Sequence, residues 1–237
     1  MPEVGAASGS AILWIHGGGW FKGDKRQFAE PAAWFCERGF VCASMKYHLS
    51  HEKPYPAAIE DARLAMQFLK RNAHAFGFDP GRIAAAGSSA GGYLAAMLAL
   101  IRPEDRLGSS AELTSADTRP AAAILYCPVT AMHEHKEHVR RFLGCGEREN
   151  PGLYREASPI GRIRGGEPPF LIVQGDADAA TPLEENAAFR DRLTAAGVDA
   201  ELAVLPGVGH GFGYGVRTDA QKAACAAAYR FLRRVLA

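Results

Sequence analysis

Short runs of consecutive apolar residues alternate along this chain with longer stretches in which apolar residues recur every three or four positions. A run without polar alternation is typical of a strand buried on both faces of a sheet. By this criterion the sequence predicts strands at residues 10–15, 40–47, 83–86, 121–126, 170–174 and 200–205.

The intervening stretches have helical spacing. The clearest is 57–73, where Ile59, Ala62, Met66 and Leu69 share one face. Further helices are predicted at residues 27–38, from residue 93 onward, at 183–196 and at 220–236. Strands alternating with helices predict an α/β fold, with a mainly parallel sheet of about six strands and helices on both faces.

The pattern predicts one domain over residues 1–237, long enough to bury a large core. The polar stretch 128–169 interrupts the alternation of strands and helices. Ligands of such sheets sit outside the carboxyl ends of the strands. We therefore expect this segment to be an insertion that forms a lid or a substrate-contacting wall.

Charge and composition narrow the function classes. The formal net charge is +1 and no dense Lys/Arg block occurs, so neither nucleic acid nor an anionic membrane surface is an expected partner. No apolar run approaches the roughly 20 residues that span a bilayer. Five scattered cysteines without C-x-x-C pairing predict reduced thiols, and the first residues lack the features of a secretory signal. These observations predict a cytoplasmic protein.

The strongest candidate for chemistry is Ser89. It stands in Gly87-Ser88-Ser89-Ala90-Gly91, between the apolar run 82–86 and a helix of small residues. A strand, a sharp turn with serine at its apex and a helix form the nucleophile elbow, in which flanking glycines remove clashing side chains. G-x-S-x-G is a weak signal alone, and gains weight from further elements that follow in the required order.

A serine hydroxyl needs a base, and the base needs an orienting acid. In this architecture the acid and then the histidine follow the serine, each after a later strand. His210 follows the last predicted strand and is the only histidine beyond His138. Asp176 and Asp178 both follow the strand at 170–174, and the residues alone leave the choice between them open.

A glycine loop, His16-Gly17-Gly18-Gly19-Trp20, directly follows the first predicted strand. Backbone N–H groups can stabilise the oxyanion of acyl transfer, which predicts donors at Gly18 and Gly19, joined by Ala90 after the nucleophile. A phosphate-binding loop is a weaker interpretation, because neither G-K-[ST] nor G-x-G-x-x-G occurs here. Trp20 and Tyr93 are candidates for lining a substrate pocket.

His133, His135 and His138 suggest a zinc site, but they form no H-E-x-x-H pattern, and their charged neighbours are typical of a solvated helix face. We therefore expect no metal. An acyl transfer that uses a serine, a histidine and an acid also needs no organic cofactor.

The motifs at 16–20 (HGGGW), 87–96 (GSSAGGYLAA), 175–182 (GDADAATP) and 207–212 (GVGHGF) resemble those of the α/β-hydrolase esterases related to hormone-sensitive lipase. The nearest branch is the compact acetyl esterase and feruloyl-esterase-like group, and the resemblance covers nearly the whole chain. It implies an α/β-hydrolase fold and assigns the acid to Asp178.

The chain departs from that family at its start, where only about ten residues precede the first strand. This implies an N-terminally shortened sheet without a large cap over the site. The strand at 40–47 then becomes an edge that needs cover from the N-terminal segment or from another subunit, as in a homodimer.

The resemblance implies a serine carboxylesterase that acts on small-molecule esters through an acyl-enzyme on Ser89. The missing cap favours short, acetyl-type acyl groups, and sugar or aryl alcohols are the implied leaving groups. One alternative is an arylformamidase-like amide hydrolase with the same three residues. Another is a non-catalytic binding protein on the same fold.

Overall fold

A computed structural model of the protein describes residues 9–114 and 117–237. Its centre is one six-stranded sheet in which every neighbouring pair of strands is parallel, in the order β2-β1-β3-β4-β5-β6. The strands are β1 (Ala11–Ile15), β2 (Val41–Met45), β3 (Ile83–Ser88), β4 (Ala122–Tyr126), β5 (Phe170–Gly175) and β6 (Ala200–Leu205). The predicted α/β class and the parallel sheet of six strands are confirmed.

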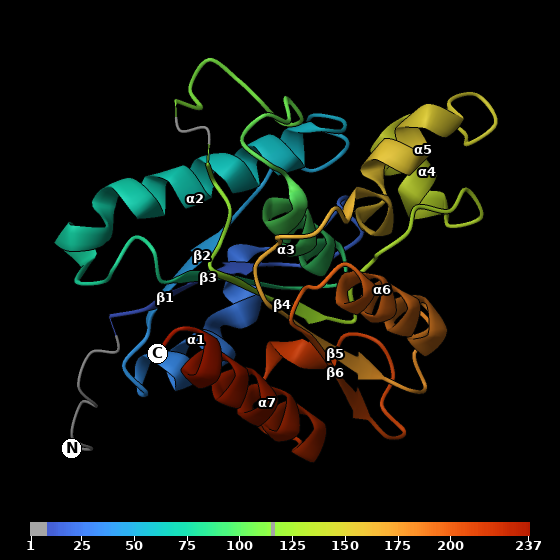
Figure 1. Ribbon diagram of the computed structural model, residues 1–237. Coiled ribbons are helices and arrows are strands. Elements are labelled where there is room, and N and C mark those ends of the chain that lie inside the picture. Colours follow the sequence, from blue (N-terminus) through green and yellow to red (C-terminus); the bar gives the residue numbers. More distant parts are fainter. Residues whose placement is uncertain (1–8, 115–116) are drawn as a thin grey trace.

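Helices pack on both faces of the sheet (Figure 1). One face carries α2 (Ala57–Phe76), α3 (Ala90–Leu100) and α6 (Leu183–Ala195), and the other carries α1 (Ala29–Cys36) and α7 (Asp219–Val235). Short 3-10 helices occur at Lys25–Phe28 (η1), Pro159–Arg162 (η2) and Phe212–Tyr214 (η3).

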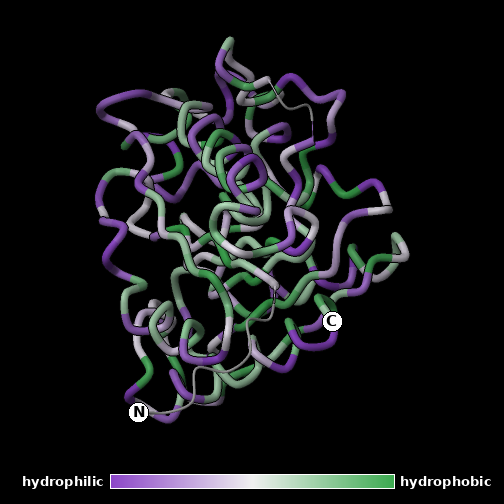
Figure 2. The backbone as a smooth tube through the Cα atoms, turned by 90° about the vertical axis from the view of Figure 1, so that its left-hand side faces the viewer, coloured by the Kyte–Doolittle hydropathy of each residue, from purple (hydrophilic) through white to green (hydrophobic). Residues whose placement is uncertain are grey.

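Each face of the sheet has its own apolar core, because successive strand residues point to opposite sides. In β1, Leu13 and Ile15 join the core under α2 and α3, whereas Ile12 and Trp14 join the core under α1 and α7. All residues of β1 are buried, which is why the sequence shows an unbroken apolar run there. Figure 2 shows hydrophobic segments gathered at the centre of the molecule and hydrophilic ones along its outer loops.

The strand order reverses between β1 and β3. The chain passes from β1 to β2 on one side, and then returns to place β3 on the other side of β1. In open parallel sheets, the carboxyl ends of the strands at such a reversal are where ligands bind. Here those ends carry the glycine loop after β1 and Ser89 after β3.

The predicted insertion contains two short helices, α4 (Glu137–Leu143) and α5 (Pro151–Ala157). Helix α4 is fixed to the core by the buried ring of Phe142, which stacks on Trp20 with 4.3 Å between ring centroids. The same ring meets Tyr93 and Tyr55 edge-on. Neither helix is long enough to give the sequence a clear period, so the sequence indicated a helix face near His138 but predicted no helix bounds in this segment.

Because Phe142 is 1% exposed and packs against three aromatic rings, Phe142→Ala is expected to leave a cavity and to lower the free energy of unfolding by about 3 kcal/mol. Urea denaturation followed by circular dichroism measures this change. Phe68→Ala is the matched control, because the ring of Phe68 is 57% exposed and its loss should change stability little. Equal losses in the two variants would contradict the packing described for α4.

The two edges of the sheet are β2 and β6. The prediction that the second strand lies at an edge is confirmed. The proposed cover by the N-terminal segment falls on residues 1–8, outside the described residues. Cover by a second subunit stays a prediction. Within the described residues, no helix combines the length and apolar character that crossing a bilayer requires.

Candidate active site

Ser89 lies at the turn between β3 and α3 with backbone angles of φ 55° and ψ −118°. Such a conformation costs a non-glycine residue about 1–3 kcal/mol and occurs most often at functional sites. The turn can be this sharp because Gly91 has no side chain: a Cβ there would lie 2.0 Å from the carbonyl oxygen of Ile15. The first turn of α3 therefore packs directly against the end of β1.

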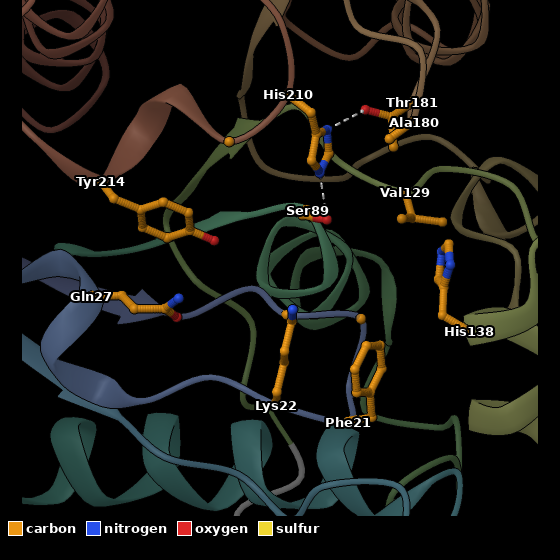
Figure 3. A pocket seen from close by; sticks show the side chains of 13 residues that line it. Phe21, Lys22, Gln27, Ser89, Val129, His138, Ala180, Thr181, His210 and Tyr214 are labelled. Carbon is orange, nitrogen blue, oxygen red and sulfur yellow. Dashed lines mark hydrogen bonds between the residues drawn. The ribbon is translucent and has the colours of Figure 1, made fainter.

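Three distant loops bring Ser89, His210 and Asp178 together. The Ser89 Oγ lies 2.9 Å from His210 Nε2, and His210 Nδ1 lies 2.7 Å from Asp178 Oδ2. The loops follow β3, β6 and β5 respectively, at the carboxyl edge of the sheet. Figure 3 shows the His210 ring above Ser89, with a nitrogen directed at the serine hydroxyl. The structure thus brings together the three residues that the sequence selected as nucleophile, base and acid.

The Asp178 carboxylate is fully buried and surrounded by donors. Its Oδ1 accepts hydrogen bonds from the backbone N–H groups of Ala180 and Thr181, and its Oδ2 accepts from the hydroxyl of Thr181 and the amide of Gln174. Burial raises the pKa of Asp178, but the hydrogen bonds from His210 and Thr181 outweigh burial and lower the pKa to about 2. The carboxylate is therefore charged at neutral pH.

Asp176, the other candidate acid, is exposed and does not contact His210. Its Oδ1 accepts a hydrogen bond from the backbone N–H of Gly207 at 2.6 Å. This contact ties the loop after β5 to the loop after β6. Asp176 is thus placed as a turn residue, whereas Asp178 is in contact with the imidazole.

The buried carboxylate also sets the protonation of His210. Burial lowers the pKa of His210, but the hydrogen bond to Asp178, together with interactions with Cys127, outweighs burial and raises the pKa above the roughly 6.5 of an unperturbed imidazole. When His210 is neutral, its Nδ1 proton is donated to Asp178, and the Nε2 lone pair faces Ser89.

Backbone donors lie next to Ser89. Among the described residues, none accepts a hydrogen bond from the N–H of Gly18 or Gly19, and the N–H of Ala90 belongs to the unpaired first turn of α3. Gly17 is in contact with the nucleophile turn, since a Cβ there would lie 3.4 Å from the Ser89 Cβ. The predicted donors therefore lack an acceptor among the described residues, and Gly18 and Gly19 line the same cavity as Ser89.

His16 holds the glycine loop in place from within the core. Its ring is fully buried and stacks on Tyr47 with 4.2 Å between centroids, and its Nδ1 lies 2.9 Å from the carbonyl oxygen of Gly17. Burial lowers the pKa of His16, so its imidazole is neutral at pH 7. His16 orients the loop and lies apart from the Ser89–His210 pair.

A cavity of about 320 Å³ opens beside Ser89 and His210 (Figure 3). Its remaining walls are formed by Gly18, Gly19, Phe21, Lys22, Gln27, Val129, His138, Ala180, Thr181, Gly211 and Tyr214. The sequence did not predict that the side chains at 21, 22, 27, 138 and 214 line the cavity. Two features of the sequence could have indicated this role. Phe21 and Lys22 directly follow the glycine loop, and His138 lies in the predicted insertion.

Trp20 and Tyr93 were expected to line a substrate pocket, but the structure places both side chains in the core. Both side chains are 0% exposed, and neither belongs to the cavity wall. Their rings meet edge-on at 5.2 Å and share Phe142 as a neighbour. They support the glycine loop and α4 from within the core, because large apolar rings gain more from burial there than from an open cavity.

Among the described residues, the one group of potential metal ligands that gathers within 4.8 Å is Cys127, Asp178 and His210. Two of these are already joined by the hydrogen bond between Asp178 and His210. His133 and His135 stack on each other at 5.4 Å and do not belong to this group. The expectation that the protein needs no metal or organic cofactor stays a prediction.

Comparisons with known proteins identify the family of the chain. The BD-FAE family model matches residues 1–193, and the dienelactone hydrolase family model matches residues 152–236. Esterase LipQ of Mycobacterium tuberculosis is 33% identical over 85% of this chain and 50% of its own length. Ethyl acetate hydrolase of Pseudomonas putida is 29% identical over 87% of this chain and 67% of its own length. The chain spans about half the length of LipQ and of the related esterase LipC.

Solved structures of esterases have the same fold as this chain. The thermophilic esterase Est2 of Thermogutta terrifontis superimposes with a TM-score of 0.83 at 30% identity, covering 99% of this chain and 84% of that one. The propionate-bound form of Est2 superimposes with a TM-score of 0.82.

Proposed function

This chain belongs to the BD-FAE family of α/β-hydrolase esterases, and from that premise we propose that it is a serine carboxylesterase acting on small-molecule esters with short, acetyl-type acyl groups. The observation that carries the proposal is the pair of contacts made by His210, at 2.9 Å to Ser89 and at 2.7 Å to Asp178. A histidine held between a carboxylate and a serine hydroxyl is the arrangement that activates serine for acyl transfer.

In the first half-reaction, Ser89 Oγ attacks the ester carbonyl carbon while His210 Nε2 accepts the hydroxyl proton. Asp178 stabilises the imidazolium and keeps Nε2 directed at the serine. The negative charge that develops on the carbonyl oxygen is bound by the N–H groups of Gly18, Gly19 and Ala90. Such a donor is worth about 3 kcal/mol in the transition state.

The intermediate then collapses, and His210 gives its proton to the departing alcohol. The acyl group stays bonded to Ser89 Oγ. A water molecule, activated by the now neutral His210, attacks the acyl carbon and releases the carboxylic acid. Every proton transfer uses the same imidazole, so no cofactor enters the reaction.

The size and lining of the cavity support a short acyl group. About 320 Å³ lies at the lower end of the range for small-molecule sites, and part of it must hold the alcohol half of the ester. The alcohol half is proposed to be a sugar or an aryl alcohol, on the resemblance of the motifs alone.

A series of p-nitrophenyl esters tests the proposal. The value of kcat/KM is expected to be highest for acetate to butyrate and to fall by more than about tenfold for octanoate, since the longer chain exceeds the cavity. N-formylkynurenine, an aryl formamide, serves as the comparison substrate. A clear preference for the formamide over p-nitrophenyl acetate would replace the ester assignment with an amide hydrolase.

The pH dependence of kcat/KM follows from the raised pKa of His210. The base must be neutral to accept the serine proton, so activity is expected to rise with pH as His210 loses its proton, with a midpoint above about 6.5. Rates corrected for spontaneous hydrolysis and measured where circular dichroism is unchanged give this midpoint. A midpoint below 6.5 would contradict the coupling of His210 to a charged Asp178.

A further inference from the structure

The cavity beside Ser89 carries a positive charge that has no negative partner among the described residues. Lys22 lines its wall, and none of the other lining residues is an aspartate or a glutamate. In Figure 3 the Lys22 side chain rises along the cavity wall, with its amino group on the side of Ser89. An ester that reaches Ser89 therefore passes an ammonium group, and the part of the cavity surface that the structure describes offers it no carboxylate.

The backbone of Lys22 is fixed by the glycine loop itself. Its N–H donates to the carbonyl oxygen of Gly18 at 3.2 Å. Gly18 adopts φ +117°, and a Cβ at that position would lie 2.2 Å from the carbonyl oxygen of Lys22. The tight turn holds the start of the lysine side chain at a constant place relative to the loop that carries the oxyanion donors.

Several cations in neighbouring segments of the chain form ion pairs. Lys136 pairs with Glu185 at 3.2 Å, Arg141 with Glu137 at 3.0 Å and Arg26 with Asp24 at 2.7 Å. Lys22, by contrast, forms no ion pair with any described residue. Its Nζ lies over the ring of Phe21, 5.5 Å from the ring centroid.

Two further wall residues can hydrogen-bond to a polar substrate. Burial and the neighbouring Lys136 and His210 lower the pKa of His138, so this half-buried side chain is a neutral hydrogen-bonding group at pH 7. Gln27 also lines the cavity, and its buried Oε1 has no hydrogen-bond partner among the described residues. The wall therefore offers hydrogen-bonding capacity that the protein does not use itself.

We infer that Lys22 forms an anion subsite, and that the preferred substrates are esters carrying a carboxylate within a few bonds of the ester group. The inference rests on the proposed esterase function, and it specifies that the preferred ester is negatively charged. The ammonium group would attract the substrate carboxylate across a partly exposed cavity, where such a pair is worth a several-fold change in rate or affinity.

The test compares matched esters that differ in charge. The p-nitrophenyl monoester of succinic acid is paired with p-nitrophenyl butyrate, which places the charge on the acyl half. Acetylated 4-hydroxybenzoate is paired with phenyl acetate, which places it on the alcohol half. The measured quantity is the ratio of kcat/KM for the charged and neutral member of each pair.

In at least one pair, Lys22→Gln is expected to lower this ratio by about fivefold and Lys22→Glu by more than tenfold. The pair that responds shows which half of the ester faces the lysine. Lys25→Gln is the matched control, because Lys25 follows in the same segment but is absent from the cavity wall, and its ratios should equal those of the wild type. Ratios unchanged by both substitutions of Lys22 in both pairs would overturn the subsite.

The wild-type protein gives a second test that needs no variant. Raising the salt concentration from about 0.01 M to about 1 M shortens the Debye length from about 30 Å to about 3 Å and should lower the ratio. A salt-independent ratio would contradict an electrostatic subsite. The neutral esters separate the two proposals, since their hydrolysis at a normal rate leaves the esterase function standing whatever the ratio does.

Discussion

Replacement of Ser89 by alanine is expected to lower kcat for p-nitrophenyl acetate by about a millionfold. The variant removes the nucleophile, so the acyl-enzyme cannot form and His210 has no hydroxyl to deprotonate. Binding of the ester and the oxyanion donors remain, so a small residual rate over water should persist. The side chain of Ser89 makes one hydrogen bond, to His210, so stability should change little. Steady-state kinetics and thermal denaturation measure both effects.

Ser88→Ala provides the matched control within the same turn. The Ser88 hydroxyl is fully buried and contacts the Cys127 thiol at 3.5 Å, on the strand side of the turn. This variant should retain activity within about tenfold of the wild type. Loss of activity in Ser88→Ala equal to that in Ser89→Ala, or near-normal activity in Ser89→Ala, would show that Ser89 is not the nucleophile.

The second large effect is expected from Asp178→Asn, which should lower kcat by about ten-thousandfold. The amide is nearly isosteric but can donate a hydrogen bond to His210 Nδ1, which favours the tautomer whose Nε2 carries a proton and cannot act as a base. It also loses the charge that stabilises the imidazolium. Kinetics at saturating ester separate this loss in kcat from any change in KM.

Asp176→Asn is the comparison for this substitution. Asp176 is exposed and accepts a hydrogen bond from Gly207 N–H, which the amide oxygen of asparagine can also accept. Its effect on kcat should stay below about tenfold. A larger loss in Asp176→Asn than in Asp178→Asn would reverse the assignment of the acid.

The sheet was predictable from sequence because its central strands are buried on both faces. Such strands as β1 and β3 need apolar or small residues at every position, and this leaves a run that stands out from the amphipathic helices. The loops after the strands were predictable for a related reason. The sharp turn at Ser89 and the close packing of Gly91 on Ile15 restrict these positions to a few residue types, which produces recognisable motifs.

The walls of the cavity were not predictable in the same way. Trp20 and Tyr93 belong to the motifs themselves, yet their rings turn into the core and pack with Phe142 from the insertion. That contact is long-range and has no sequence period. Lys22 and His138 reach the cavity from exposed or half-buried segments, where side-chain direction depends on tertiary packing and not on local pattern.

The most direct test of the central claim is the reaction of the protein with a fluorophosphonate, followed by peptide mapping by mass spectrometry. The account predicts a single covalent adduct on Ser89 that forms in proportion to the loss of esterase activity. It also predicts that formation of the adduct slows greatly in His210→Gln, because the serine then lacks its base. An adduct on any other residue while activity is lost, or full inactivation with Ser89 unmodified, would contradict the account.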